Sequence, residues 1–107
     1  MRYGVDLPDG SFENGFKRLL WWLLVATRGG EMRLKIVELL ENEPSNINRI
    51  SKVLGVNYRT IEHHIKVLED NHLIIPEGQK YGKVYFLSPS LIRNKWLIGE
   101  ILKKRER

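Results

Sequence analysis

Three side chains near the middle of the sequence, Arg59, His63 and Lys66, combine hydrogen-bonding capacity with positive charge at the spacing of one helix face. At about 100° per residue, His63 falls about 40° and Lys66 about 20° from Arg59, whereas the apolar Ile61 and Ile65 fall on the opposite side. Arginine can donate two parallel hydrogen bonds to O6 and N7 of guanine, and cationic side chains contact phosphates. The spacing therefore indicates an outward cationic face suited to a duplex groove.

Further groups able to contact a duplex lie beside this face and in a later turn. The candidates are Asn57, Tyr58, Thr60 and Glu62 near the start of the same helix, Lys80, Tyr81 and Lys83 around Gly82, and, as secondary contacts, Arg49 and Lys52. Lysines at a hairpin tip can flank a minor groove or bind phosphates as point charges, and glycine permits a tight turn. A basic stripe on an isolated helix is more often only a solvated surface, so its interpretation depends on the surrounding elements.

The elements around the stripe predict a helix-turn-helix. A helix over about 45–54, capped by Ser45 or Asn46, leads through a Leu-Gly-Val turn into a second helix over about 58–70, which Asn57 caps. In this motif the second helix fixes its inner face to the core and leaves its outer face free to enter the major groove. Residues 57–66 are therefore the predicted reading surface, in major-groove contact.

The remaining pattern completes a mainly α fold with a small β-hairpin, a winged helix-turn-helix. We expect a flexible lead-in at residues 1–10, helices over about 12–27 and 31–42, a hairpin wing whose turn spans residues 76–83, and a final helix over about 90–105. Residues 11–107 form a single predicted domain, since 107 residues suit one modest core.

Composition narrows the possible functions. A formal charge of +5 favours a polyanionic partner, and the excess lies after residue 43, with six basic and four acidic residues in 44–87 and six and two in 88–107. With no cysteine, the chain has no disulfide, thiolate metal site or thiol nucleophile, which fits a reducing cytoplasm. No catalytic triad, P-loop or dinucleotide fingerprint is visible, so we expect neither an enzyme nor a cofactor.

The longest apolar run, LLWWLLVA from Leu19 to Ala26, is too short to cross a bilayer, which takes about 20 residues. Acidic residues precede it and the small-residue cleavage pattern is poor, so we favour a buried helix over a signal peptide. Between Phe16 and Ala26 only Lys17 and Arg18 are polar, and one small core cannot cover so apolar a helix. An isologous dimer would cover it, although the helix could instead be buried within one chain.

Three stretches carry a family resemblance: TRGGEMRLKIVELL, INRISKVLGVNYRTIEHHIKVLEDNHLI and KYGKVYFLSP, covering about residues 28–89. They resemble the winged helix-turn-helix regulators of the ArsR type, particularly their compact archaeal members. The most specific part runs from Ile50 to Ile74, with its Leu-Gly-Val turn, its paired histidines and its Leu-Glu-x-Asn-x-Leu-Ile ending. The resemblance implies a homodimeric repressor or activator that binds double-stranded DNA, with a dimer built from the first and last helices, within residues 11–28 and 90–105.

The implied dimer interface comprises Phe16, Leu19, Leu20, Trp21, Trp22, Leu23 and Leu24 in the first helix, with Trp96, Leu97, Ile98, Ile101 and Leu102 in the last. An effector pocket between these helices near Trp22 and Trp96 is conceivable, but two tryptophans in an apolar interface are more often simple packing.

The chain also departs from the family, since many members sense metals and this one lacks the cysteines and most of the histidines for it. His63 and His64 project about 100° apart and cannot chelate one ion from a regular helix, so we expect no metal site. We interpret His63 as an outward residue and His64 as a partly buried packing residue. The main rival interpretation is a winged helix that binds proteins of the transcription machinery; RNA is disfavoured because a helix cannot enter the A-form major groove.

Overall fold

The computed structural model describes residues 11–79 and 82–105, so the predicted lead-in and the wing residues Lys80 and Tyr81 lie outside the described part of the chain. The elements are α1 (Ser11–Trp21), the π-helical segment η1 (Trp22–Ala26), α2 (Gly30–Asn42), α3 (Ile47–Leu54), α4 (Tyr58–Asp70), β1 (Ile74–Glu77), β2 (Val84–Leu87), α5 (Pro89–Asn94) and α6 (Trp96–Arg105). The prediction of a mainly helical chain with one antiparallel hairpin, a winged helix-turn-helix, is confirmed.

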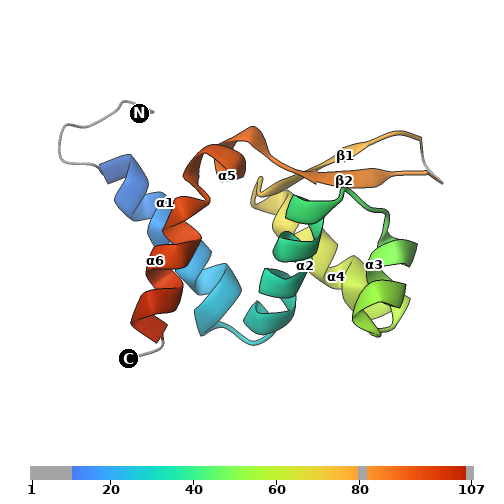
Figure 1. Cartoon of the computed structure of the whole chain (residues 1–107), viewed down its shortest axis with the longest axis horizontal. Helices are drawn as coiled ribbons and strands as arrows, with labels where there is room; N and C mark the ends of the chain where they lie inside the picture. Colours follow the sequence, from blue (N-terminus) through green and yellow to red (C-terminus); the bar gives the residue numbers. More distant parts are fainter. Residues whose placement is uncertain (1–10, 80–81, 106–107) are drawn as a thin grey trace.

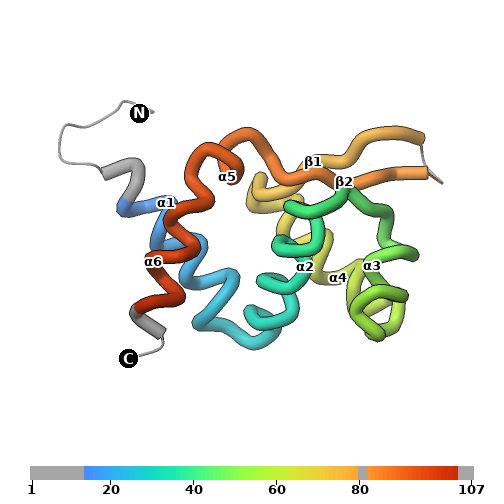
Figure 2. Tube along the Cα trace, viewed as in Figure 1, coloured from blue at the N-terminus to red at the C-terminus, as the bar shows by residue number. Residues whose placement is uncertain are grey.

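The elements separate into two ends joined by α2 (Figure 1). At one end α1 and α6 lie side by side, and at the other α3 and α4 lie next to the hairpin. The Cα trace leaves α4, runs out along β1 and returns along β2 before it enters α5 and α6 (Figure 2). The hairpin therefore belongs to the helix-turn-helix end, while the last helix returns to the first.

The helix-turn-helix is built from two asparagine caps and one glycine. The Asn46 side chain accepts a hydrogen bond from the Arg49 N–H at 2.8 Å, and the Asn57 side chain accepts one from the Thr60 N–H at 2.9 Å. Each cap satisfies an N–H group that a helix start leaves without an acceptor. Gly55 ends α3 in the left-handed region at φ +67°, which allows the sharp turn into α4. The predicted turn and its caps are confirmed.

The hairpin is fixed to the body of the protein by main-chain bonds. Its strands pair in the register Ile74↔Leu87 to Glu77↔Val84. Tyr85 also exchanges backbone hydrogen bonds with Ser45, at 2.9 and 3.3 Å, so the loop between α2 and α3 adds a bridge to the outer edge of β2. The orientation of the hairpin is thus set by the segment that leads into α3.

One continuous core runs through both ends. Every element contributes buried apolar residues, with Leu20 and Leu24 at one end and Ile61, Ile65 and Leu68 of α4 at the other. The inward residues predicted for α4 are therefore confirmed, and burial of this stripe fixes which side of α4 faces outward.

Two boundaries differ from the sequence-based expectation. The first helix widens at Trp22 into a π-helical turn, in which the Thr27 N–H reaches the Trp22 carbonyl, five residues back, at 3.2 Å. The expected single helix over 90–105 is divided at Lys95, where Ile98 bonds to the Lys95 carbonyl in a tighter i to i−3 pattern. Breaks in helices are often marked by proline, and neither of these contains one. The apolar spacing from which the helices were predicted gave no sign of either break.

A buried arginine ties the two ends together. The Arg33 guanidinium, in a residue only 5% exposed, donates to the Leu23 carbonyl at 2.8 Å and to the Thr27 Oγ1 at 2.8 Å. It also lies 3.2 Å from the Arg28 carbonyl and 3.2 Å from Nδ1 of His64 on α4. The turn between η1 and α2 is therefore held to the predicted reading helix through one side chain.

Gly29 makes this contact possible, and it provides a test. Gly29 has φ +87°, and a Cβ there would lie 2.7 Å from His64 Cε1 and 2.8 Å from Arg33 Nη1, whereas a Cβ at Gly55 meets nothing within 4 Å. Gly55→Ala should cost about 1 kcal/mol of unfolding free energy from backbone strain alone, and Gly29→Ala about 2–4 kcal/mol because a steric clash is added. Urea denaturation measures both; equal losses would contradict the contact.

Candidate nucleic-acid interface

The outer face of α4 is open. Arg59, Glu62, His63 and Lys66 are all exposed, while the buried stripe points to the core. Within the described ranges, Arg59 and His63 take part in no ion pair. Lys66 lies 3.3 Å from the Asp70 carboxylate, but both side chains are exposed, and a surface pair of this kind is weak. The cationic groups on this face are therefore accessible to an anionic partner.

The start of α4 adds an amide group and two hydroxyl groups. Asn57 uses its side-chain oxygen for the helix cap, which leaves its amide group as a donor. Tyr58 is exposed, and Thr60 is partly buried. Of these, Tyr58 extends toward the hairpin, since it shares a pocket with Lys83.

The two secondary candidates on α3 differ in availability. The Arg49 guanidinium donates to the Ser45 hydroxyl at 2.6 Å and pairs with the Glu43 carboxylate at 3.2 Å. Lys52 is exposed and forms no ion pair with the described residues. Arg49 therefore tethers the start of α3, and Lys52 is the freer cation of the two.

The wing differs from expectation in which glycine shapes it. Gly78, not Gly82, adopts the left-handed conformation, at φ +105°, and a Cβ there would lie 2.8 Å from the Gly82 carbonyl. The Gly82 N–H closes the turn by bonding to the Gln79 carbonyl at 2.9 Å. Sequence reasoning favoured Gly82 because it sits between the lysines, but the close backbone approach is at Gly78.

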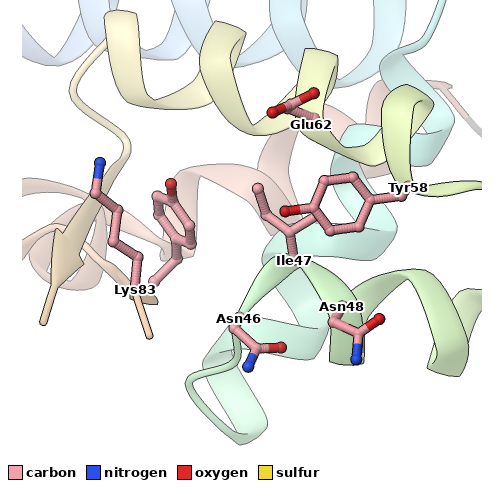
Figure 3. A pocket seen from close by; sticks show the side chains of 7 residues that line it. Asn46, Ile47, Asn48, Tyr58, Glu62 and Lys83 are labelled. Carbon is pink, nitrogen blue, oxygen red and sulfur yellow. The ribbon is translucent and has the colours of Figure 1, made fainter. Parts of the chain in front are cut away.

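Lys83 faces the helix-turn-helix across a pocket of about 220 Å³ (Figure 3). Lys83 enters from the hairpin, Tyr58 and Glu62 from α4, and Asn46, Ile47 and Asn48 from the start of α3. Tyr85 of β2 also lines the pocket, a residue that sequence reasoning missed because it reads as an ordinary strand aromatic. The structure thus brings three predicted contact residues, Tyr58, Glu62 and Lys83, to one hollow.

His64 is buried, as the interpretation of a packing residue requires. Burial lowers the pKa of His64, and the positive charge of Arg33 and then the nearby His63 lower it further. The neutral ring can accept the hydrogen bond from Arg33 at Nδ1. Arg33 itself was missed, because a charged residue on an amphipathic helix is normally assigned to the solvent side.

The predicted interface helices contain both core and surface residues. Trp21, Trp22 and Trp96 are 43%, 56% and 51% exposed. Leu20, Leu23, Leu24, Leu97 and Ile101 are buried within one chain, while Phe16, Leu19, Ile98 and Leu102 are partly buried against the core. The five buried residues hold α1, η1 and α6 together, so the expectation that they face a partner is corrected: the single chain already uses them.

Among the described residues, no group of three or more His, Asp or Glu side chains is placed to hold a metal ion. None of the helices in the same ranges is long and apolar enough to cross a membrane.

A sequence profile described as the N-terminal domain of the methanogenesis regulatory protein FilR1 matches residues 24–88, which is more than half of the 107 residues. The chain belongs to this family. The matched segment runs from the end of η1 through the helix-turn-helix and the hairpin to the Ser88 cap. Comparison with curated proteins gives no match.

Solved structures share the fold at low sequence identity. HlyU from Vibrio cholerae N16961 aligns with a TM-score of 0.63 and 20% identity over 85% of this chain and 92% of that chain. The homodimeric winged helix-turn-helix DNA-binding domain of Mb0332 from Mycobacterium bovis, a possible ArsR-family transcriptional regulator, aligns with a TM-score of 0.63 and 15% identity over 97% and 91%. MepR from S. aureus, solved with ethidium bromide, aligns with a TM-score of 0.57 and 17% identity over 90% and 71%. The expected likeness to ArsR-type winged helix regulators is confirmed at the level of the fold.

The lowered pKa of His64 predicts a pH-dependent stability. Above the ordinary histidine value of 6.5, His64 is neutral in both the folded and unfolded states. As the pH falls below that value the unfolded chain takes up the proton first, so the free energy of unfolding decreases. Thermal unfolding between pH 7.5 and 5.5 should show this decrease in the parent and a flatter profile in His64→Gln, which keeps an acceptor for Arg33.

His63→Gln is the matched control, because it removes an exposed histidine one residue away. It should keep most of the pH-dependent decrease, because His63 is only the third cause of the lowered pKa of His64. A flattened profile in His63→Gln, with an unchanged profile in His64→Gln, would show that the pH dependence comes from His63 and would contradict the prediction.

Proposed function

We propose that this chain is a homodimeric transcription regulator that binds double-stranded DNA sequence-specifically, with α4 in the major groove and the wing on the adjacent minor groove or backbone. The observation that carries the proposal is the open outer face of α4, where Arg59, His63 and Lys66 are exposed above a fully buried inner stripe. A helix presented in this way after a tight turn fits the width of the B-DNA major groove. The family of regulators to which the chain belongs supports the same assignment.

The chemistry of this face favours DNA over a protein partner. A protein-binding surface would be expected to be apolar or acidic at its centre, and the one apolar residue near this face, Val67, is partly buried. Arg59 can donate to guanine O6 and N7, while Lys66, Lys52 and Lys83 are placed on three different elements to contact phosphates. Base contacts would supply the discrimination and the lysines would supply general affinity.

The dimer is proposed at the other end of the molecule. Trp21, Trp22 and Trp96 keep about half of their surface exposed at the end of the molecule where α1, η1 and α6 pack together, and three such exposed tryptophans are unusual on a monomer. The homodimeric domain of Mb0332, which shares the fold, supports this assignment. A two-fold axis through α1 and α6 would separate two copies of α4 and match a pseudo-palindromic site, with half-sites roughly 34 Å apart.

Arg59 and Lys83 are expected to contribute to binding in different ways. Arg59→Ala should reduce the preference for a specific duplex over a random one by about 1–3 kcal/mol, because a base contact is lost. Lys83→Ala should weaken both duplexes equally and lower the dependence on salt, because a phosphate contact is lost. Fluorescence anisotropy titrations at two salt concentrations, with a duplex selected from a random library, distinguish the two effects.

Arg93→Ala and Lys103→Ala are matched controls, since they remove exposed cations of the same types from α5 and α6. Both should bind as the parent does. If Arg59→Ala also kept the parent preference between duplexes, α4 would not read bases through this residue.

The dimer assignment is tested by placing a charge at Trp22, the most exposed of the three tryptophans. Trp22→Glu should convert the dimer into a monomer, because a carboxylate buried in an apolar interface without a partner is costly. Sedimentation equilibrium measures the mass. Val53→Glu, at an equally exposed apolar residue on α3, should remain dimeric. A parent that sediments as a monomer, or a Trp22→Glu dimer, would disprove the interface.

A further inference from the structure

The hydroxyl of Tyr85 is a buried polar group without a partner in the described part of the chain. Tyr85 is only 5% exposed, and its backbone bonds to Ser45, but its phenol makes no hydrogen bond with residues 11–79 or 82–105. A buried hydroxyl of this kind normally costs free energy unless something accepts or donates a bond to it. Such a group is therefore a candidate for a contact made only in a complex.

The phenol lies at the pocket between the wing and the helix-turn-helix. Tyr85 lines this hollow together with Tyr58 and Glu62, and both of these act electrostatically on its phenol. The carboxylate of Glu69, which does not line the hollow, acts on the phenol more strongly than either of them. The phenol therefore lies close to side chains of α4 as well as to the pocket. Figure 3 shows Lys83 on one side of this hollow and the start of α3 on another.

The other lining groups are mostly hydrogen-bond donors. Ile47 and Asn48 are the first two residues of α3, and the Asn46 cap serves only the N–H of Arg49, so their own N–H groups have no acceptor within the helix. The positive end of the α3 dipole is aimed at the same place. Lys83 adds an ammonium group that pairs with no carboxylate among the described residues.

The phenol remains a donor at any ordinary pH. Burial raises the pKa of Tyr85, and the carboxylate of Glu69, the Tyr58 phenol and the carboxylate of Glu62 raise it further. The phenol has no hydrogen-bond acceptor among the described residues, and the same pocket holds the donors of Lys83 and of the start of α3. A phosphate group is an acceptor that can satisfy several donors at once.

We propose that this pocket holds one phosphate of the bound DNA backbone, with the Tyr85 hydroxyl donating to it from the floor of the hollow. The proposal rests on the proposed function, since it is the duplex between α4 and the wing that would bring the phosphate there. Glu62 lines the pocket and Glu69 acts on the same phenol from α4, and both carboxylates oppose an anion. A free phosphate ion is therefore bound weakly, whereas a backbone phosphate is held in place by the other contacts of the duplex.

The test combines one protein variant with one chemical change in the DNA. Tyr85→Phe removes only the hydroxyl, and because that group has no partner in the described residues, the ring packing is retained. The selected duplex is synthesised as a series in which each phosphate in turn is replaced by an uncharged methylphosphonate. Ser90→Ala, which removes a hydroxyl on α5 away from the pocket, is the matched control.

The parent should lose about tenfold in affinity at one methylphosphonate position in each half-site, the scale of one hydrogen bond to a charged group. Tyr85→Phe should lose about tenfold on the unmodified duplex and show little further loss at that position. Ser90→Ala should reproduce the parent throughout. Unfolding measurements should find Tyr85→Phe at least as stable as the parent, which separates a binding effect from misfolding.

The outcomes separate this inference from the proposed function. If the parent binds no duplex, the proposed function itself fails. If the parent binds but Tyr85→Phe binds equally well and shows the same methylphosphonate profile, only the phosphate site is overturned. Inorganic phosphate is the second probe: shifts of the Ile47 and Asn48 amide signals without any position-specific methylphosphonate effect would assign the pocket to a free anion and overturn the proposal.

Discussion

The buried guanidinium of Arg33 is the interaction on which the arrangement of the two ends depends. Its hydrogen bonds go to two carbonyls, one hydroxyl and the ring of His64, and among the described residues no carboxylate neutralises it. A buried charge held only by dipoles is stable when each donor has a partner in the correct place. Any rearrangement of the η1–α2 turn would therefore be felt at α4, because the same guanidinium satisfies both.

This coupling limits which side chains fit in the middle of the molecule. Gly29 is in contact with both Arg33 and His64, and the ring of His64 must remain neutral to accept a hydrogen bond. The contact therefore needs three things at one point: the Arg33 donor, the His64 acceptor and a residue without a side chain at Gly29. The end that contains α1 and α6 and the end that contains the helix-turn-helix are connected through this contact as well as through the apolar core.

Local signals in the sequence were sufficient for most of the fold. Asparagine caps, Gly55 and the apolar period of α4 each act within a few residues, so the helix-turn-helix and its outward face could be predicted in detail. The π-helical turn and the break at Lys95 could not, since neither involves proline and the apolar pattern of the sequence continues through both. Arg33 and Tyr85 were missed for a related reason: their roles arise from what lies opposite them in space.

The candidate site likewise contains residues that could be predicted from the sequence and a pocket that could not. Arg59, His63 and Lys66 followed from periodicity alone, because the angle between residues on a helix is fixed. The hollow that joins Tyr58, Glu62 and Lys83 to Tyr85 required the register of the hairpin and its bridge to Ser45, and neither is encoded by spacing in the sequence.

The paired main-chain bonds between Ser45 and Tyr85 have a mechanical consequence. They fix the hairpin relative to the segment that starts α3, so the distance between the wing and the helix-turn-helix changes little. A duplex bound between the two must adapt its own groove width, and the energy of that deformation depends on base-pair steps that the protein never touches. Selectivity would then arise partly from the stiffness of the nucleic acid.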